Sequence, residues 1–458
     1  MSQNREQWGS KLGFILAASG SAVGIGNIWK YPHMAGQNGG AAFTLVYLAC
    51  ILVVGLSIVI AEFVIGRKTQ LSPVGAFEQL APSTNWKWVG FLGVASAFVI
   101  LSFYGVVGGW VLKYVIVSIT GGFNELAGDP DAAGNVFNTF ITDTWSPIIY
   151  QVFFMAFCVW VIVNGVKGGI EKWSKIMMPL IVVLLAVLAV RGMTLEGGMK
   201  GISFLFNPRF EDLTANSIVL ALGHSFFTVS LGMGTMITYG SYLNRKQNLL
   251  NAALWVIALD TAIAMLAGIA IFTTVFALGA NPAEGPGLIF VVLPSVFSQL
   301  AGGTLWGTMF FVLLFMAALT SAISILEVVT AYFIDQKGWS RKKATIQFGA
   351  VITIVGVFCS LSMGGGVNIT EFLGMPFFDV MDYLSAKYML PIGGMLTAIF
   401  ILRKWGISNY MAELKSGMGD TNISSRLVQV VLTIAAAVVA FIIFNEVYAE
   451  IFGKALIG

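Results

Sequence analysis

Charged residues are scarce in this chain, and their scarcity argues against an ordinary soluble protein. Only 10% of the 458 residues are Asp, Glu, Lys or Arg, whereas 57% are hydrophobic and the mean hydropathy is +0.85. Soluble domains contain about 25% charged residues. The apolar runs leave no polar stretch long enough for a separate core, so we expect one membrane domain, residues 1–458. No basic patch for nucleic acid is visible.

Cysteine and histidine are equally rare. Cys50, Cys158 and Cys359 lie in apolar segments without C-x-x-C spacing, which argues against a disulfide framework and a zinc site. His33 and His224 stand alone, so the sequence contains no metal triad. It also has no nucleophile elbow, Walker loop or HExxH helix, and these absences give an enzyme no support.

Long apolar runs dominate the chain instead. At about 20 apolar residues per span, they predict an all-α polytopic membrane protein with about eleven helices. The predicted helices lie near residues 12–36, 41–66, 88–119, 148–164, 173–191, 217–241, 250–279, 304–334, 343–361, 383–402 and 427–452. The segment 281–300 is apolar but carries three prolines, so we expect a folded extracellular loop there.

The distribution of lysine and arginine indicates the orientation. With the N-terminus in the cytoplasm, 18 of the 25 Lys and Arg residues fall on the cytoplasmic side and the other seven outside. Cytoplasmic loops of membrane proteins carry this excess of positive charge. We therefore expect a multi-pass protein of the cell (inner) membrane with the C-terminus outside.

Two predicted helices, the first and the sixth, contain glycines that disfavour a continuous helix. Gly20, Gly24 and Gly26 fall within two turns of the first, and the sixth reads G-H-S-F-F-T-V-S-L-G-M-G over residues 223–234. Each glycine inside a helix costs roughly 1 kcal/mol. Glycines also allow close helix packing. Because two helices contain such glycines, and Asn27 directly follows those of the first, we favour a break in each helix. Paired breaks of this kind indicate a binding site between inverted repeats.

A helix break exposes carbonyls on one side and amides on the other, which suits a zwitterion. An amino acid would place its carboxylate near the amides around Gly24 to Gly26. Its ammonium group would lie near free carbonyls around Ala22 and Phe227.

Three acidic residues fall inside predicted helices, where a charge is expensive and therefore a functional candidate. Asp260 has no basic neighbour in the sequence, so a bound cation is its expected partner. Glu62 is expected to support the site by accepting hydrogen bonds from amides freed in the first helix. We assign no role to Glu327.

In the eighth helix, the Ala317 carbonyl and the Thr320 hydroxyl share one face, beside Ser321. Hard cations prefer such oxygens. Hydroxyls in membrane helices also bond back to their own helix, and this alternative stays open for these residues.

These residues resemble the neurotransmitter:sodium symporter family, and within it the bacterial amino-acid transporters with the LeuT fold. The resemblance covers nearly the whole chain, through R-x-x-W at 5–8, residues 20–27, N-G-G-A at 38–41, F-T-x-S-L-G at 227–232 and L-T-S at 319–321. It implies a 5+5 inverted repeat, with helices 1–5 at about 12–191, helices 6–10 at about 217–402, and helix 11 at about 427–452 outside it.

The resemblance also implies the site residues. A first sodium site would use Ala22, Asn27, Thr228, Asp260 and the substrate carboxylate. A second sodium site would use Gly20, Val23, Ala317, Thr320 and Ser321. The substrate pocket would be formed by Ala22, Gly24, Gly26, Ile100, Tyr104, Phe227, Thr228, Ser230, Met233, Ser321 and Ile325. The gates would be Lys30 with Asp382 and Phe227 over Tyr104 outside, and Arg5 with Asp335, Trp8, Ser241 and Tyr242 inside.

Several positions depart from the family pattern. Lys30 replaces an arginine, so the outer ion pair should be looser, and Ser21 replaces an asparagine. His224 replaces a glutamine that borders the chloride site of animal members. Asp260 replaces an asparagine, and its carboxylate is expected to supply the charge that chloride provides elsewhere. Met233 replaces a phenylalanine, which should make the pocket adaptable.

The resemblance therefore implies a sodium-coupled symporter, with two sodium ions, that works by alternating access without chloride. The apolar pocket residues predict hydrophobic neutral L-amino acids, with aromatic ones among the candidates. The other expected partner is the lipid bilayer, and the protein would be a monomer or homodimer, not an enzyme. Two alternatives stay open: a proton-coupled transporter in which Asp260 or Glu62 carries the proton, and a non-transporting amino-acid sensor.

Overall fold

The computed structural model describes residues 5–126, 129–279, 287–364, 374–418 and 423–453. These residues form helices and connecting turns, with one isolated bridge between Gly40 and Pro208 and no strand among them. The predicted all-α polytopic membrane fold is confirmed.

Nine helices of the described residues are long and apolar enough to cross a membrane, and one bent pair makes ten. The bent pair is α1 (Lys11–Ala22) with η1 and α2 (Gly26–Gln37). The others are α3 to α4 (Ala41–Thr69), α6 (Lys87–Ile119), α8 (Ser146–Val163), η4 to α9 (Val166–Met193), α13 (Leu249–Ala277), α15 (Gly303–Lys337), α16 (Arg341–Leu361), α17 to η8 (Phe377–Trp405) and α20 (Ser425–Phe452).

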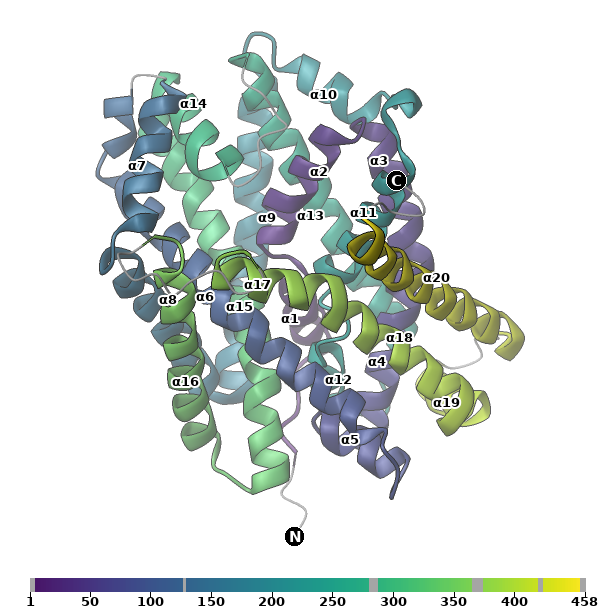
Figure 1. The fold of residues 1–458 in the computed structure, drawn as a ribbon. Helices are drawn as coiled ribbons and strands as arrows, with labels where there is room; N and C mark the ends of the chain where they lie inside the picture. The colour runs from purple at the N-terminus through teal and green to yellow at the C-terminus, as the bar shows by residue number, and fades with distance from the viewer. Residues whose placement is uncertain (1–4, 127–128, 280–286, 365–373, 419–422, 454–458) are drawn as a thin grey trace.

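Both predicted breaks are present. The first helix bends by 52° between Ala22 and Gly26. The helix predicted at 217–241 appears as α11 (Ala215–Thr228) and α12 (Thr235–Gly240), separated by residues 229–234 and each too short to be counted alone. Figure 1 shows α1, α2 and α12 near the middle of the bundle.

Polar residues mark where several helices begin. Ser10, Thr214, Asn248, Ser340 and Ser424 each accept a hydrogen bond from the backbone amide three residues later. Such N-caps satisfy amides that have no partner within the helix. These five positions therefore fix the first turns of α1, α11, α13, α16 and α20.

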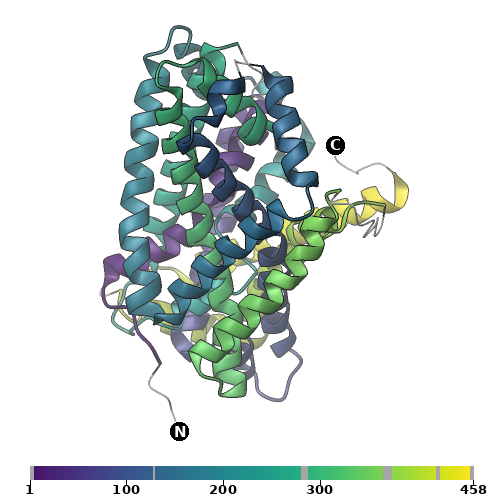
Figure 2. The ribbon, with the colours of Figure 1, turned by 90° about the vertical axis from the view of Figure 1, so that its left-hand side faces the viewer.

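The helices differ greatly in burial, which shows which of them are central and which are peripheral. In their most apolar windows, 83% of α15 and 72% of α6 are buried inside the protein, but only 22% of α20. In Figure 2 the yellow α20 projects from the bundle. The central helices α6 and α15 are therefore the ones placed to line an internal site.

Several short helices lie between the long ones and were not predicted. They are α5 (Pro73–Leu80), α7 (Pro130–Thr142), α10 (Met199–Phe206), α14 (Leu293–Gln299) and α19 (Ile407–Lys415). In the segment predicted as a folded loop, residues 288–299 form helical turns in η6 and α14, and residues 281–286 lie outside the described part.

Candidate substrate and sodium sites

The two helix breaks face one internal cavity between α6 and α15. All eleven residues predicted for the substrate pocket line this cavity, and Ser21 lines it too. The predicted set is thus brought together from four separate parts of the chain.

The glycines of the first break lie where side chains of other helices come very close to the backbone. A Cβ atom at Gly24 would lie 2.6 Å from Ser321 Oγ and 3.1 Å from the Tyr104 hydroxyl. A Cβ atom at Gly26 would lie 3.1 Å from the Phe227 ring. These glycines therefore do more than weaken the helix, since a side chain at Gly24 would fill part of the cavity.

The second break combines left-handed backbone with a buried carboxylate. Ser230, Gly232 and Gly234 have φ of 54°, 77° and 78°. The freed Gly232 amide donates to Glu62 Oε1 at 2.8 Å, and Glu62 is 1% exposed. The predicted partners, amides of the first helix, are therefore not the ones observed: Glu62 accepts from the break in the sixth helix, because α4 packs against α12 there.

Polar groups of the cavity come mainly from the backbone and hydroxyls. The Ile25 amide donates to the Tyr104 hydroxyl at 3.4 Å, which places that hydroxyl beside the freed amides of the first break. The Phe227 carbonyl, predicted to be free for an ammonium group, accepts from the Ser230 amide at 3.2 Å. That carbonyl is therefore partly satisfied by the turn that follows α11.

The predicted first sodium site forms one buried cluster around Asp260. The carboxylate accepts hydrogen bonds from Asn27 Nδ2 at 2.7 Å, Thr228 Oγ1 at 3.0 Å and the Tyr47 hydroxyl at 3.2 Å. Asn27 Oδ1 in turn accepts from the Gly24 amide at 3.1 Å. All four side chains are at most 1% exposed, so the cluster joins α3, α11 and α13 to the first break.

No ion pair to Asp260 occurs among the described residues. A buried carboxylate without a cationic partner is expensive, and its oxygens suit a hard cation. The sequence interpretation missed Tyr47, which donates to this carboxylate. Its only signal was a tyrosine within an apolar helix.

The predicted second sodium site is also brought together. Ser321 Oγ lies 3.2 Å from the Ser21 carbonyl, 3.3 Å from the Val23 carbonyl and 3.5 Å from the Gly20 carbonyl. In α15, Thr320 Oγ1 donates to the Ala317 carbonyl at 3.0 Å. Thr320 therefore donates to its own helix, which leaves its oxygen lone pairs available, whereas Ser321 reaches across to the first break.

A second link joins the first helix to α15. The hydroxyls of Ser21 and Ser324 are 2.7 Å apart and both are buried. Ser21 therefore has a polar partner on α15. This contact fixes the last turn of α1 beside the cavity.

The outer side of the cavity is covered by Phe227 and an ion pair. Lys30 Nζ lies 3.3 Å from Asp382 Oδ1 and 4.2 Å from the centre of the Phe227 ring. The Lys30 and Asp382 side chains are 26% and 36% exposed. The cation–π contact was not predicted. Through it, Lys30 contacts both the Phe227 ring and Asp382.

The inner side is closed by the N-terminal segment. Arg5 forms an ion pair with Asp335, donates to Ser241 Oγ at 2.7 Å and lies 4.6 Å from the centre of the Tyr242 ring. Trp8 Nε1 donates to the Tyr239 carbonyl at 3.0 Å. All five predicted inner residues therefore meet at one place, since the Trp8 amide also donates to the Tyr242 carbonyl at 3.2 Å.

Glu327, to which the sequence assigned no role, belongs to the same inner cluster. It is 0% exposed, accepts from the Tyr242 hydroxyl at 2.5 Å and pairs with Arg341 at 2.7 Å. Arg341 also pairs with Glu6 at 2.7 Å. The N-terminal segment is thus held by α15 and by the first turn of α16.

His224 packs against Tyr47 of the Asp260 cluster. Both ring nitrogens are buried and lack a hydrogen bond in the described part of the chain. Its ring packs 5.3 Å from Tyr47 and 6.4 Å from Tyr31 between ring centres. The histidine therefore fills the region by packing.

Comparisons with known proteins agree with this geometry. Residues 5–127 and 141–453 match the profile of the sodium:neurotransmitter symporter family. An uncharacterized sodium-dependent transporter of Bacillus subtilis is 40% identical over 91% of each chain. One of Methanocaldococcus jannaschii is 33% identical over 94% of this chain and 89% of its own. The crystal structure of MhsT in complex with L-phenylalanine superposes with a TM-score of 0.87, at 46% identity, over 96% of this chain and 99% of MhsT.

Proposed function

The chain belongs to the sodium:neurotransmitter symporter family, and we propose that this sodium-coupled transporter imports hydrophobic neutral L-amino acids, aromatic ones included, without chloride. One observation carries the proposal. One cavity between two broken helices combines freed backbone groups with the apolar side chains of Ile100, Met233 and Ile325. MhsT was solved with L-phenylalanine, which supports an aromatic substrate.

We propose that the substrate carboxylate binds beside the Tyr104 hydroxyl and the amides that follow Gly24. The side chain of the amino acid would contact Ile100, Met233 and Ile325. Methionine is flexible and polarisable, so the wall at Met233 can adapt to side chains of different bulk.

Two sodium ions are proposed as co-substrates. The first binds between Asp260, Asn27, Thr228 and the Ala22 carbonyl, where a buried carboxylate has no basic partner. The second binds among the carbonyls of Gly20, Val23 and Ala317 and the hydroxyls of Thr320 and Ser321. Hard cations take oxygen ligands of this kind.

Transport would proceed by alternating access. Opening outward separates Lys30 from Asp382 and moves Phe227, whereas opening inward separates Arg5 from Asp335. Both sets of contacts are closed in this structure, so the cavity is covered on both sides. We further propose an inner-membrane location with the N-terminus in the cytoplasm and the C-terminus outside, as a monomer or homodimer.

The test is uptake into proteoliposomes. Labelled L-phenylalanine, L-leucine and L-glutamate are supplied with an inward sodium gradient, in chloride or in gluconate. We expect uptake of the first two only, equal in both anions and absent without sodium. Uptake driven by a pH gradient without sodium would favour the proton-coupled alternative, and binding without uptake would favour a sensor.

A further inference from the structure

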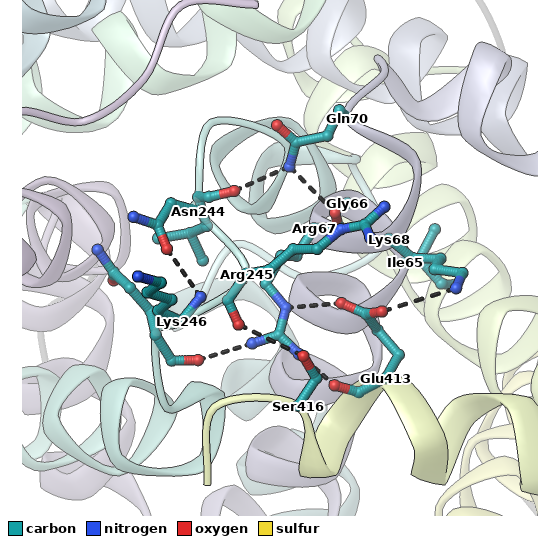
Figure 3. Close-up of polar contacts among 12 residues, drawn as sticks. Ile65, Gly66, Arg67, Lys68, Gln70, Asn244, Arg245, Lys246, Glu413 and Ser416 are labelled. Carbon is teal, nitrogen blue, oxygen red and sulfur yellow. Dashed lines mark hydrogen bonds and ion pairs between the residues drawn. The ribbon is translucent and has the colours of Figure 1, made fainter.

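A buried polar cluster at the inner end of α4 lies outside the substrate and sodium sites (Figure 3). Arg67 is 0% exposed and Glu413 of α19 is 6% exposed. Arg67 Nε donates to Glu413 Oε1 at 2.8 Å, and Nη2 donates to the Glu413 carbonyl. Nη1 donates to the Gln247 carbonyl at 2.6 Å, so one guanidinium joins α19 to the loop between α12 and α13.

Two further contacts hold this loop, residues 243–248. Gln70 Nε2 donates to the Leu243 carbonyl at 2.8 Å and to the Arg67 carbonyl at 3.0 Å. From the end of α19, Ser416 Oγ donates to the Arg245 carbonyl at 3.4 Å. The loop is thereby bound by α4 on one side and by α19 on the other.

The loop begins directly after the inner gate. Leu243, which Gln70 holds, follows Tyr242, and Tyr242 contacts Arg5 and Glu327. The loop is therefore continuous with the backbone that carries the Tyr242 side chain.

α4 and α12 are also in direct backbone contact. A Cβ atom at Gly66 would lie 2.0 Å from the Ile237 carbonyl oxygen, and one at Gly240 would lie 2.9 Å from the Phe63 carbonyl oxygen. Interiors packed this closely transmit displacement instead of absorbing it. α4, α12 and the loop that follows are thus built to move together.

A buried ion pair is a poor device for stability alone. Desolvation offsets most of the Coulomb attraction, and apolar residues of similar volume often replace such a pair without loss. An arginine does, however, fix the relative positions of its acceptors, because its donors lie in one rigid plane. Arg67 uses all three of its nitrogens in this way.

We propose that Arg67 is a positioning residue of the inner gate, and that α19 and residues 243–248 move as one body with α4 and α12 during transport. This inference rests on the proposed function. α19 connects the last two membrane helices. Through Glu413 and Ser416 it would then move with the inner gate when the gate opens.

A disulfide between α19 and the loop 243–248 tests whether the two move together. Arg245→Cys and Ser416→Cys are combined, because the Ser416 hydroxyl lies against the Arg245 backbone. We expect the pair to cross-link on mild oxidation and the oxidised protein to keep at least half the sodium-driven uptake of the reduced protein. The two single-cysteine variants, oxidised in the same way, control for Cys50, Cys158 and Cys359.

Each other outcome overturns the inference. Loss of uptake on oxidation, restored by reductant, would mean that α19 must separate from the loop during transport. Failure to cross-link in the folded protein would contradict the contact itself. If the parent protein shows no sodium-driven uptake at all, the proposed function fails instead, and the two failures are thus distinguishable.

The positioning role has its own test. Arg67→Met combined with Glu413→Leu removes both charges and leaves neither one buried alone. We expect amide hydrogen exchange in residues 241–248 to rise at least 10-fold and maximal uptake to fall about 10-fold. Amino-acid affinity should stay within 3-fold of the parent. Unchanged exchange and uptake in a folded variant would refute the role.

Lys68→Ala is the matched control for this variant. Lys68 Nζ lies 3.8 Å from Glu413 Oε2, and its side chain is 43% exposed. We expect parental exchange and uptake, because exposed ion pairs contribute little. An effect as large as that of the double variant would assign the role to the Lys68–Glu413 ion pair instead of the geometry of Arg67.

Discussion

Replacing Asp260 by asparagine removes the buried charge of the proposed first sodium site while keeping the shape of the side chain. The asparagine oxygen can still accept from Asn27 and Thr228, which now bind Oδ1 at 2.7 and 3.0 Å. The new amide nitrogen would take the place of Oδ2, where the hydroxyls of Tyr47 and Thr228 can accept from it. The variant is therefore expected to fold, and its phenotype should report the charge.

The size of the effect follows from the charge. Two unit charges about 4 Å apart attract by about 4 kcal/mol at an effective dielectric constant near 20. Part of this is offset, because the neutral amide needs less desolvation than the carboxylate. A net loss of about 1.5 to 3 kcal/mol corresponds to a sodium affinity about 10- to 150-fold weaker.

The assay is the sodium dependence of amino-acid uptake in proteoliposomes, in chloride and in gluconate. We expect Asp260→Asn to need about 10- to 150-fold more sodium for half-maximal uptake, less so in chloride if an anion can replace the lost charge. Thr261→Val, on the same helix, is the control and should behave as the parent. A sodium dependence within twofold of the parent, with no response to chloride, would refute the role of Asp260.

Further substitutions test the cavity and the outer gate. Gly24→Ala should abolish uptake because its Cβ would lie 2.6 Å from a side-chain oxygen, whereas Gly223→Ala, with no atom within 4 Å, should keep it. Tyr104→Phe should weaken equilibrium binding of the amino acid by about 10-fold or more, since it removes a hydrogen bond to a charged group; parental affinity would exclude that contact. Lys30→Arg should slow substrate exchange by about 2- to 5-fold through a firmer outer pair, and faster exchange would contradict this.

The span limits were predictable because they depend on local composition. The predicted helix at 88–119 corresponds to Lys87–Ile119, and the one at 427–452 to Ser425–Phe452. The breaks were predictable for the same reason, since clustered glycines disfavour a helix wherever they occur. The short helices α5 and α19 were not, because each carries too few apolar residues to resemble a span.

Tertiary partners set the limit of prediction at the site. Glu62 was correctly singled out as a buried acid, but its partner is the Gly232 amide and not an amide of the first helix. Glu327 was also singled out as a buried acid but received no role, because its partners lie far away in the sequence: Tyr242 directly after α12 and Arg341 at the start of α16. A sequence shows that a buried charge needs a partner; only packing decides which one.

The same packing explains why the first break can couple two ligands. On one side Asn27 contacts Asp260 of α13 at 2.7 Å, and on the other the Val23 carbonyl lies 3.3 Å from Ser321 Oγ of α15. The cavity lies between these contacts and includes Gly24. An ion bound on either side would fix the backbone that a substrate between them must use, and such coupling is reciprocal for binding free energies. Because residues 23–27 are shared, neither ion site can rearrange without changing the cavity, and this is the physical basis we propose for symport.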